Sequence, residues 1–347
     1  MTDSRADTIL QALRQVPYPG YEHDIVTLGI VEDIAPQERG GFVITLRQAT
    51  ENDTLMRELA ATVEARLSRQ RGLAPIALRV RRMEAELGEK TGRMRLAGVR
   101  HVIAIASGKG GVGKSTVAAN LSLALAARGL AVGLLDADIY GPSMGLMFDA
   151  MAERPRSAGP ERFYPVERHG IKLISMAFFL TERAPVIWRG PMVMSAVRQF
   201  LQQTSWGELD YLIVDLPPGT GDAQLTLAQL VALDGAVIVT TPQDLALLDA
   251  MRAVRMFHQV HCPILGVIEN MSGFVCPQCG ESEPIFGSGG GARMAAQEGV
   301  PLLGTLPLDL SVGETGDRGT PLVLDQPDHA LSRGFAQIAR QLIETLP

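Results

Sequence analysis

The segment that most constrains the fold is "SGKGGVGKST", Ser107–Thr116. It stands between the β-rich apolar run "HVIAIA" (101–106) and the helix-forming run "VAANLSLALAARG" (117–129). Its G-x-x-x-x-G-K-S pattern is that of a phosphate-binding P-loop, and a preceding strand and a following helix are the context that such a loop requires. The segment therefore predicts that the chain holds the phosphates of a nucleotide at the start of a helix.

Each part of this loop has a predicted role. The glycines let backbone N–H groups turn inward around the phosphates, and the helix N-terminus adds a partial positive charge. The Lys114 ammonium would reach the β- and γ-phosphates, and the Ser115 hydroxyl would bind Mg²⁺. The predicted nucleotide-binding residues of the loop are Gly108, Lys109, Gly110, Gly111, Val112, Gly113, Lys114, Ser115 and Thr116.

The order of apolar runs predicts the fold class. From residue 101 onward, helix-length segments alternate with short β-rich runs: "HVIAIA", "AVGLLD", "YLIVD", "GAVIVT" and "ILGVI". Such runs fit strands that are buried on both faces of a parallel sheet. Residues 101–347 are therefore predicted to form one α/β P-loop NTPase domain, a parallel sheet with helices on both faces. Residues 1–82 have the alternating patterns of a small α+β domain, and the polar residues 83–100 are expected to be a linker.

Composition limits the partners and the compartment. The chain of 347 residues is 46% apolar and 20% charged, as soluble globular proteins are. Its net charge of −6 argues against nucleic acid as the main partner, because phosphate backbones are bound by basic surfaces. No run of about 18 uncharged apolar residues predicts a membrane span, and "MTDSRADTILQ" is no signal segment. Three cysteines are too few for a disulfide framework, so a cytoplasmic protein with no membrane partner is expected.

Two acidic segments complete the predicted phosphate site. "LIVDLPPGTGD" places Asp215 at the end of an apolar strand, where its carboxylate can hold Mg²⁺ through water. "LLDADIYGPS" ends another strand with Asp136 and Asp138, and a carboxylate there can orient the attacking water. Acidic residues at strand ends also cap turns and helices, which is the favoured interpretation for Asp222 and an open one for Asp136. The predicted catalytic residues are Lys109, Lys114, Asp138 and Asp215.

"CPQCG" is a C-x-x-C knuckle, formed by Cys276 and Cys279, that offers fewer ligands than a metal needs. The pattern fits a thioredoxin-like redox pair, half a zinc ribbon or half an iron–sulfur site. A redox pair should open a helix, whereas turn-forming prolines and glycine surround this one. A closed thiolate site takes four ligands. Because Cys262 is better explained as a small buried apolar residue, one chain supplies two.

Lys109 indicates where two further ligands would come from. A second lysine at this point resembles the "deviant" P-loop class, in which this lysine reaches across a dimer to the partner's nucleotide. If two copies face each other in this way, a symmetry axis can bring both knuckles together. A homodimer with Cys276 and Cys279 of both subunits around one metal or cluster then satisfies the coordination count.

Residues 101–347 resemble the Mrp/ApbC-type P-loop ATPases that carry iron–sulfur clusters. The matching blocks are "HVIAIASGKGGVGKST", "DADIYGPS", "WRGPMV", "LDYLIVDLPPGTGD", "TTPQDLALLDA", "ENMSGFVCPQCG", "IFGSGGG" and "GDRGTPLV". The resemblance implies a homodimer that binds ATP, holds Mg²⁺ through Ser115 and Asp215, and hydrolyses ATP slowly.

The same resemblance implies a [4Fe–4S] cluster bridging the dimer through Cys276 and Cys279. The cluster would be passed to apo iron–sulfur proteins, with a cluster-assembly scaffold as a further partner. Asn270, Pro307 and Asp309 would contact the adenine base, although a strand end and a turn also explain residues of these types.

Residues 1–82 resemble the small α+β domain that is often fused ahead of this ATPase. "YPGYEHDIVTLGIVEDI" matches its opening, with Tyr18–Gly20 in place of the usual Asp-Pro-Glu. Asp53 stands where that domain carries a cysteine before its second helix. A docking or regulatory role is therefore expected for this domain, rather than a role that uses a thiol.

Two alternatives remain open from the sequence. A positioning ATPase of the MinD/ParA sort shares the double-lysine loop but would need a membrane- or DNA-binding device. The amphipathic segment "ALSRGFAQIARQLIETLP" carries too few cations for a lipid anchor and is expected to dock on the core. The other alternative keeps the dimer and places structural zinc at the four thiolates, because zinc and iron–sulfur sites share cysteine ligands.

Overall fold

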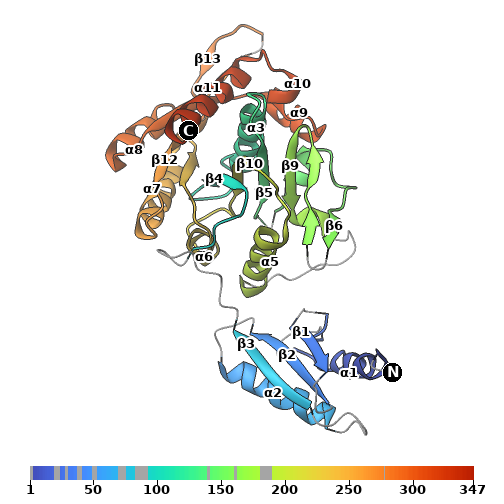
Figure 1. Cartoon of the computed structure of the whole chain (residues 1–347). Coiled ribbons are helices and arrows are strands. Elements are labelled where there is room, and N and C mark those ends of the chain that lie inside the picture. The colour runs from blue at the N-terminus through green and yellow to red at the C-terminus, as the bar shows by residue number, and fades with distance from the viewer. Residues whose placement is uncertain are drawn as a thin grey trace. The chain divides into compact units, whose positions relative to one another are not determined.

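The structure, a computed structural model, describes residues 3–18, 24–27, 30–36, 41–48, 53–68, 76–82, 93–138, 141–159, 162–179, 190–276 and 278–347. It contains two compact units, residues 1–87 and 88–347 (Figure 1). The division into 1–82, 83–100 and 101–347 stays a prediction, because most of the expected linker lies outside the described residues. Met94, within that linker, is buried and forms a bridge with Val231 of the larger unit.

The smaller unit is a three-stranded sheet with two helices. Its elements are α1 (Asp3–Leu13), β1 (Val31–Pro36), β2 (Phe42–Gln48), α2 (Asp53–Leu67) and β3 (Ile76–Arg82). β1 and β2 are antiparallel, whereas β2 and β3 are parallel because α2 forms the crossover between them. Leu59, Val63 and Leu67 recur every four residues and are buried with Ile44 and Leu46 of β2.

The larger unit is built on one sheet, which has nine strands in the described part of the chain. The strands are β4 (Val99–Ala106), β5 (Val132–Asp136), β8 (Val166–Arg168), β9 (Ile171–Ser175), β10 (Leu209–Asp215), β11 (Gly235–Thr240), β12 (Ile264–Val275), β13 (Ser282–Glu283) and β14 (Leu302–Leu308). The helices are α3 (Lys114–Ala126), α4 (Met144–Met147), α5 (Gly190–Gln203), α6 (Asp222–Leu230), α7 (Asp244–Gln259), α8 (Gly290–Glu298), α9 (Leu310–Asp317), α10 (Leu322–Asp325) and α11 (Ala330–Thr345), with a 3-10 turn η1 (Met176–Phe178). β6 (Arg156–Gly159) and β7 (Arg162–Tyr164) pair separately.

The strand order is β13-β12-β11-β4-β10-β5-β9-β8, with β14 also paired to β12. The predicted parallel arrangement is confirmed for the centre of the sheet, and the antiparallel strands β8 and β13 are additions at its edges. β8 turns into β9 through His169 and Gly170, which both have positive φ. Two such residues form the kind of tight hairpin turn that joins antiparallel strands.

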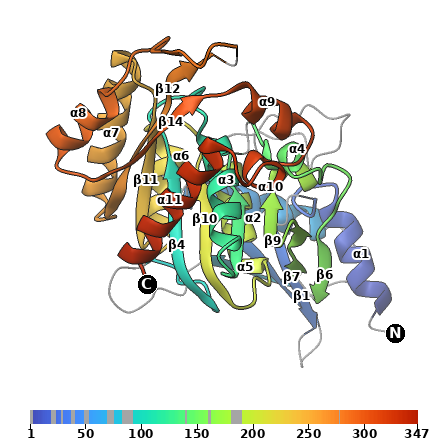
Figure 2. The ribbon, with the colours of Figure 1, turned by 90° about the horizontal axis from the view of Figure 1, so that it is seen from above.

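Helices cover both faces of this sheet, as the continuous apolar runs predicted. In β4, Ile103 and Ile105 belong to the core under α3 and α11, whereas Val102 and Ala104 belong to the opposite core under α5, α6 and α7. α3 and α11 lie side by side on the same face (Figures 1 and 2). Because successive side chains of a strand point to opposite faces, both sets must be apolar.

The last helix docks on the core, which confirms the expectation for "ALSRGFAQIARQLIETLP". Leu331, Phe335, Ile338 and Leu342 are all buried along one side of α11. Among the described residues, no helix combines the length and the apolar character that crossing a bilayer requires.

Replacing Leu342 by Ala should lower the free energy of unfolding of the larger unit by about 2–5 kcal/mol, because it leaves a cavity between α11 and the sheet. Urea unfolding followed by tryptophan fluorescence measures this, since Trp188 and Trp206 both belong to that unit. The exposed Gln337→Ala in the same helix serves as control and should stay within about 0.5 kcal/mol of the wild type. Equal effects of the two substitutions would contradict the docking of α11.

Candidate functional site

The P-loop occupies the turn between β4 and α3, as predicted. Gly111 and Gly113 have φ of 80° and 81°, the left-handed region in which glycine is favoured. A Cβ on Gly113 would lie 2.2 Å from the Asn270 side-chain nitrogen, and a Cβ on Gly108 would lie 2.1 Å from the Asp249 carbonyl carbon. β12 and α7 therefore press against the loop and fix its conformation.

Lys114, Ser115 and Asp215 meet at the carboxyl end of the sheet. The Lys114 ammonium lies 2.5 Å from one Asp215 carboxylate oxygen, and the Ser115 hydroxyl donates to the other at 2.6 Å. Both charged side chains are buried. Burial raises the pKa of Asp215, and the Lys114 charge opposes that rise. The structure thus brings together the lysine and the two residues predicted to hold Mg²⁺.

Asp136 anchors the acidic segment that follows β5. Its fully buried carboxylate accepts hydrogen bonds from the Ser175 hydroxyl (2.8 Å) and from the Met144 N–H (3.2 Å). Burial, followed by the charge of Asp215, raises the pKa of Asp136 to about 7. These contacts support the structural interpretation that the sequence left open for Asp136.

Asp138 lies two residues further along this segment. Its N–H donates to Asp136 at 3.2 Å, and its own carboxylate accepts from the Gly141 N–H at 3.3 Å. The side chain is largely buried and close enough to Asp215 for the two charges to interact. Asp222 is the first residue of α6, and its side chain is not among those that the structure describes.

Gln224 on α6 makes two contacts at the site that the sequence did not predict. Its buried side-chain amide donates to the Pro217 carbonyl at 2.7 Å and to the Ser107 carbonyl at 3.3 Å. It therefore joins the loop after Asp215 to the first residue of the P-loop. The neighbouring "PPGTGD" pattern marked the loop, but nothing in the sequence singled out this glutamine.

The three residues expected to contact the adenine base lie in different settings. The Asn270 side-chain amide donates to the Val112 carbonyl of the P-loop at 2.9 Å. Pro307 lies on β14, and Asp309 caps α9 by accepting from the Ser311 N–H at 2.8 Å. The structure thus brings Asn270 to the loop and gives Asp309 a capping contact.

A hollow of about 230 Å³ lies beside Thr116, between α3, α4 and α9. Thr116, Asn120, Leu146, Met147 and Val312 are among the residues that line it. None of the three expected base contacts lines it.

Lys109 keeps its side chain partly exposed. Its carbonyl accepts from the Ser107 hydroxyl at 2.9 Å, which holds the loop backbone. Among the described residues, no ion pair of the Lys109 ammonium is found.

The cysteine knuckle forms the tip of the β12–β13 hairpin. The Cys276 N–H donates to the Glu281 carbonyl at 2.9 Å, and the Gly280 N–H returns to the Cys276 carbonyl at 2.8 Å. Backbone N–H groups of Cys279 and Gln278 lower the pKa of the Cys276 thiol, because they hydrogen-bond to its sulfur. Cys276 is half-buried and Cys279 is exposed, so a turn presents two accessible thiols, one of them favoured as thiolate.

Within the described part of the chain, no three His, Cys, Asp or Glu side chains are grouped closely enough to hold a metal ion. Cys262 precedes β12, at the opposite end of that strand from Cys276, and is buried. Burial raises its thiol pKa to about 12, which disfavours the thiolate that metals bind.

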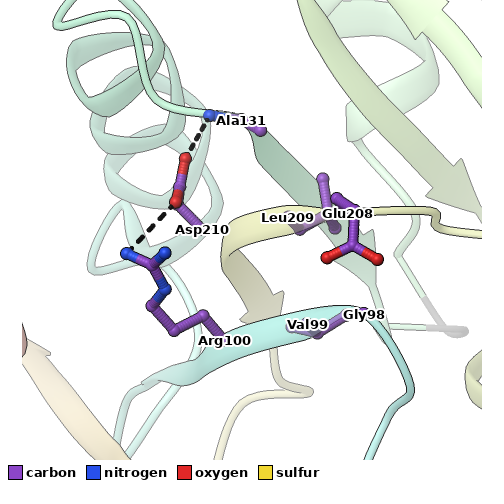
Figure 3. Close-up of a pocket in the computed structure, with 7 residues that line it drawn as sticks. All are labelled: Gly98, Val99, Arg100, Ala131, Glu208, Leu209 and Asp210. Atoms are coloured by element: carbon purple, nitrogen blue, oxygen red, sulfur yellow. Dashed lines mark hydrogen bonds and ion pairs between the residues drawn. The ribbon is translucent and has the colours of Figure 1, made fainter.

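A second hollow, of about 350 Å³, lies at the opposite end of the sheet (Figure 3). Its Asp210 carboxylate accepts from the Ala131 N–H at 2.9 Å and faces the Arg100 guanidinium at 3.5 Å (Figure 3). Arg100 and Asp210 stand at the amino ends of β4 and β10, whereas the P-loop follows the carboxyl end of β4. This hollow is therefore separate from the phosphate site.

Asp136→Asn should remove part of the pH dependence of stability. The pKa of Asp136 rises from 3.8 to about 7 on folding, so the folded state binds the proton more tightly. The free energy of unfolding should then fall by about 1.4 kcal/mol per pH unit between about pH 4 and pH 7, and stay low above that range. Urea unfolding at about pH 5.5 and about pH 8 should show a smaller difference for the variant than for the wild type. The exposed Asp328→Asn is the control, and an unchanged pH difference in Asp136→Asn would refute the assignment.

Comparisons with known proteins show which family the chain resembles. The ParA family model described as NUBPL iron-transfer P-loop NTPase matches residues 98–343. The iron-sulfur cluster carrier protein of Synechocystis sp. is 45% identical over 341 residues, covering 97% of this chain and 96% of the relative. The protein of the same name from Pseudomonas fragi is 53% identical over 245 residues, covering 70% of this chain and 85% of the relative.

Solved structures confirm the fold class. The nucleotide-binding protein of Archaeoglobus fulgidus in complex with ADP is 38% identical, with a TM-score of 0.60 over 69% of this chain and 93% of that chain. The cell division ATPase MinD of Pyrococcus furiosus, 23% identical with a TM-score of 0.53 over 71% of this chain and 99% of that chain, shares the fold alone. Because the family model spans more than half of the residues and a relative is 45% identical over almost the whole length, this chain belongs to the family of NUBPL iron-transfer P-loop NTPases.

Proposed function

We propose that this protein is an ATP-hydrolysing carrier of iron–sulfur clusters, which holds a [4Fe–4S] cluster between two subunits and delivers it to apo-proteins. The observation that carries the proposal is the pair of accessible thiols on a hairpin that continues from the same strand as a P-loop contact. Asn270 of β12 binds the P-loop carbonyl, and Cys276 directly follows that strand. The names of the relatives, iron-sulfur cluster carrier proteins, support the same cargo.

The nucleotide half of the proposal rests on the buried Lys114–Asp215 pair. Incoming phosphates would compete for the Lys114 ammonium and leave Asp215 in need of another positive charge. The Ser115 hydroxyl and the Asp215 carboxylate, 2.6 Å apart, are the hard oxygen donors that Mg²⁺ prefers. When bound there, Mg²⁺ would neutralise charge on the phosphoryl oxygens.

The remaining roles in hydrolysis fall to Asp138 and Lys109. Asp138 would orient the attacking water, because its carboxylate lies on the segment that Asp136 anchors beside Asp215. Lys109 would reach the nucleotide of a second subunit, which fits its partly exposed side chain. Because hydrolysis would then need residues of both subunits, we expect the purified protein to hydrolyse ATP slowly.

The cluster is the cargo of the hairpin. Each chain contributes Cys276 and Cys279, so a two-fold dimer provides the four thiolates that a [4Fe–4S] cluster takes. The lowered pKa of Cys276 favours the ligating form. A homodimer in the cytoplasm, with apo iron–sulfur proteins and an assembly scaffold as partners, follows from this proposal.

The smaller unit would then serve in docking or regulation. Asp53, which stands where the related domain has a cysteine, is the first residue of α2, and its side chain lies outside the described residues. The fused sheet-and-helix unit offers a surface for scaffold or recipient, without a thiol at that position.

Anaerobic reconstitution with iron and sulfide tests the cargo. The wild type should bind about four irons per dimer and show the visible absorption of an iron–sulfur cluster, because four thiolates are available. Cys276→Ala and Cys279→Ala should each lose both signals, whereas Cys262→Ala should keep them, since Cys262 is buried at the far end of β12. A colourless wild type that retains about one zinc per dimer would instead establish the structural-zinc alternative.

Two lysine substitutions separate nucleotide binding from hydrolysis. Lys114→Ala should abolish binding of Mg-ATP, because it removes the cation at the phosphates and leaves Asp215 unpaired. Lys109→Ala should bind Mg-ATP with wild-type affinity but lose hydrolysis, because its ammonium would act across the dimer. Calorimetric titration and phosphate release measure the two properties, and Arg100→Ala, at the opposite end of the sheet, is the control. Wild-type hydrolysis by Lys109→Ala would argue against the cross-dimer role.

A further inference from the structure

β12 carries the P-loop contact and leads into the cysteine hairpin, and its pairing with β14 is irregular between the two. Its register with β14 shifts between Asn270 and Phe274. Within that interval Met271 and Gly273 have φ of 56° and 81°, so the chain bends sharply twice. The regular ladder of the sheet is thus interrupted over residues 271–273 and resumes at Phe274, which pairs with Leu308 of β14.

Glu269 closes the base of this hairpin. Its fully buried carboxylate accepts from the hydroxyl of Ser272, which lies between Met271 and Gly273, at 2.5 Å. It also accepts from the N–H groups of Gly289 (3.0 Å) and Gly291, where the chain returns to α8. One carboxylate thus holds both ends of the segment that contains Cys276.

The glycine-rich return, "GSGGG", is shaped around this carboxylate. A Cβ on Gly291 would lie 2.8 Å from the Glu269 Cβ and 2.9 Å from a carboxylate oxygen, while one on Gly290 would lie 2.7 Å from the Pro242 carbonyl oxygen. The N-terminus of α8 offers its N–H groups to the negative charge. Among the described residues no ion pair of Glu269 is found, so these hydrogen bonds offset the free energy of burying it.

Glu269 is also the residue next to Asn270. Asn270 donates to the Val112 carbonyl, and Gly113 touches the same side-chain amide closely enough to exclude a Cβ. A displacement of the P-loop backbone is therefore transmitted to residue 270 and, through one peptide unit, to the carboxylate that holds the hairpin.

We propose that Glu269 is a positioning residue that couples the nucleotide site to the cysteine hairpin, so that nucleotide bound at the P-loop restrains Cys276 and Cys279. This inference rests on the proposed nucleotide site and cluster site, and it adds the path between them. Because coupling between two sites is reciprocal, thiol ligation at the hairpin would change nucleotide affinity by the same factor.

Thiol alkylation of the full-length, metal-free, reduced protein tests the coupling without requiring a cluster. The rate at which iodoacetamide modifies Cys276 and Cys279 is measured by mass spectrometry, with and without saturating Mg-ADP. In the wild type Mg-ADP should slow this rate at least about fivefold, the lower end of typical coupling between sites. The buried Cys262 serves as an internal reference for global unfolding.

Glu269→Gln should reduce the effect of Mg-ADP to less than about twofold, because an amide cannot accept from all three donors. The matched control is Glu283→Gln, which removes an exposed carboxylate from the same hairpin and should keep the wild-type ratio. If Glu269→Gln does not fold, Ser272→Ala, which removes one donor to the carboxylate, should give an intermediate ratio. Mg-ADP affinity of the folded variants should stay within about threefold of the wild type, which a general loss of structure would not allow.

The coupling would be overturned if Mg-ADP left the alkylation rate of the wild type nearly unchanged. It would also be overturned if Glu269→Gln or Ser272→Ala kept the same ratio of alkylation rates, without and with Mg-ADP, as the wild type. Failure of the proposed function gives a different result. A protein that binds no iron but still shows the Glu269-dependent ratio would disprove the cargo and retain the coupling.

Discussion

The ion pair between Lys114 and Asp215 is the interaction on which the rest of the larger unit depends. Two charges removed from water are tolerable only if each finds the other, so the P-loop helix and the end of β10 must meet within hydrogen-bonding distance. Strand register achieves this, because Asp215 is level with Ile105 of β4 and with Asp136 of β5. A slip of one residue would turn Asp215 to the opposite face of the sheet. The central parallel strands and the helices packed on both faces therefore hold the carboxyl ends of these strands in register.

The sequence revealed the parts of the site whose signals are local. The P-loop, the strand-end position of Asp215 and the cysteine turn each depend on residues within about ten positions of one another, and the structure places the predicted Mg²⁺ ligands in contact. It could not reveal Ser175, because that residue meets Asp136 only through the pairing of β5 with β9. Glu269 gave the same signal as Asp215, an acidic residue after an apolar run. Two of its three partners are backbone N–H groups of Gly289 and Gly291, and backbone groups leave no mark in a sequence. The edge strands β8 and β13 were missed because two or three residues are too few to show periodicity.

Along β12, the phosphate site lies in the packed sheet and the thiol site lies on a more exposed hairpin. Ile264–Asn270 lies between two neighbouring strands, β11 and β14, and Val267, Ile268 and Glu269 are paired with both. Beyond the bend, Phe274 and Val275 are paired with the short strand β13, and Val275 and Ile285 are exposed on the hairpin. A thiol site that must release its cargo gains from standing on such an outlying hairpin, while phosphate binding gains from the rigid core. Glu269 lies at the junction between the sheet core and the hairpin.

The close approach of α7 to the P-loop also sets which substitutions the loop can accept during evolution. The atoms nearest a Cβ on Gly108 belong to the backbone of Asp249 and Ala250, which no change of side chain can move away. A compensating second substitution is therefore not available nearby, and only a shift of the whole helix would make room. Gly110 differs, since the nearest atoms to a Cβ there belong to the ring of Pro218, 4.0 Å away. Sequence drift in this loop is thus limited at position 108 by helix packing, whereas packing leaves room at position 110, so two glycines of one motif are under unequal constraint.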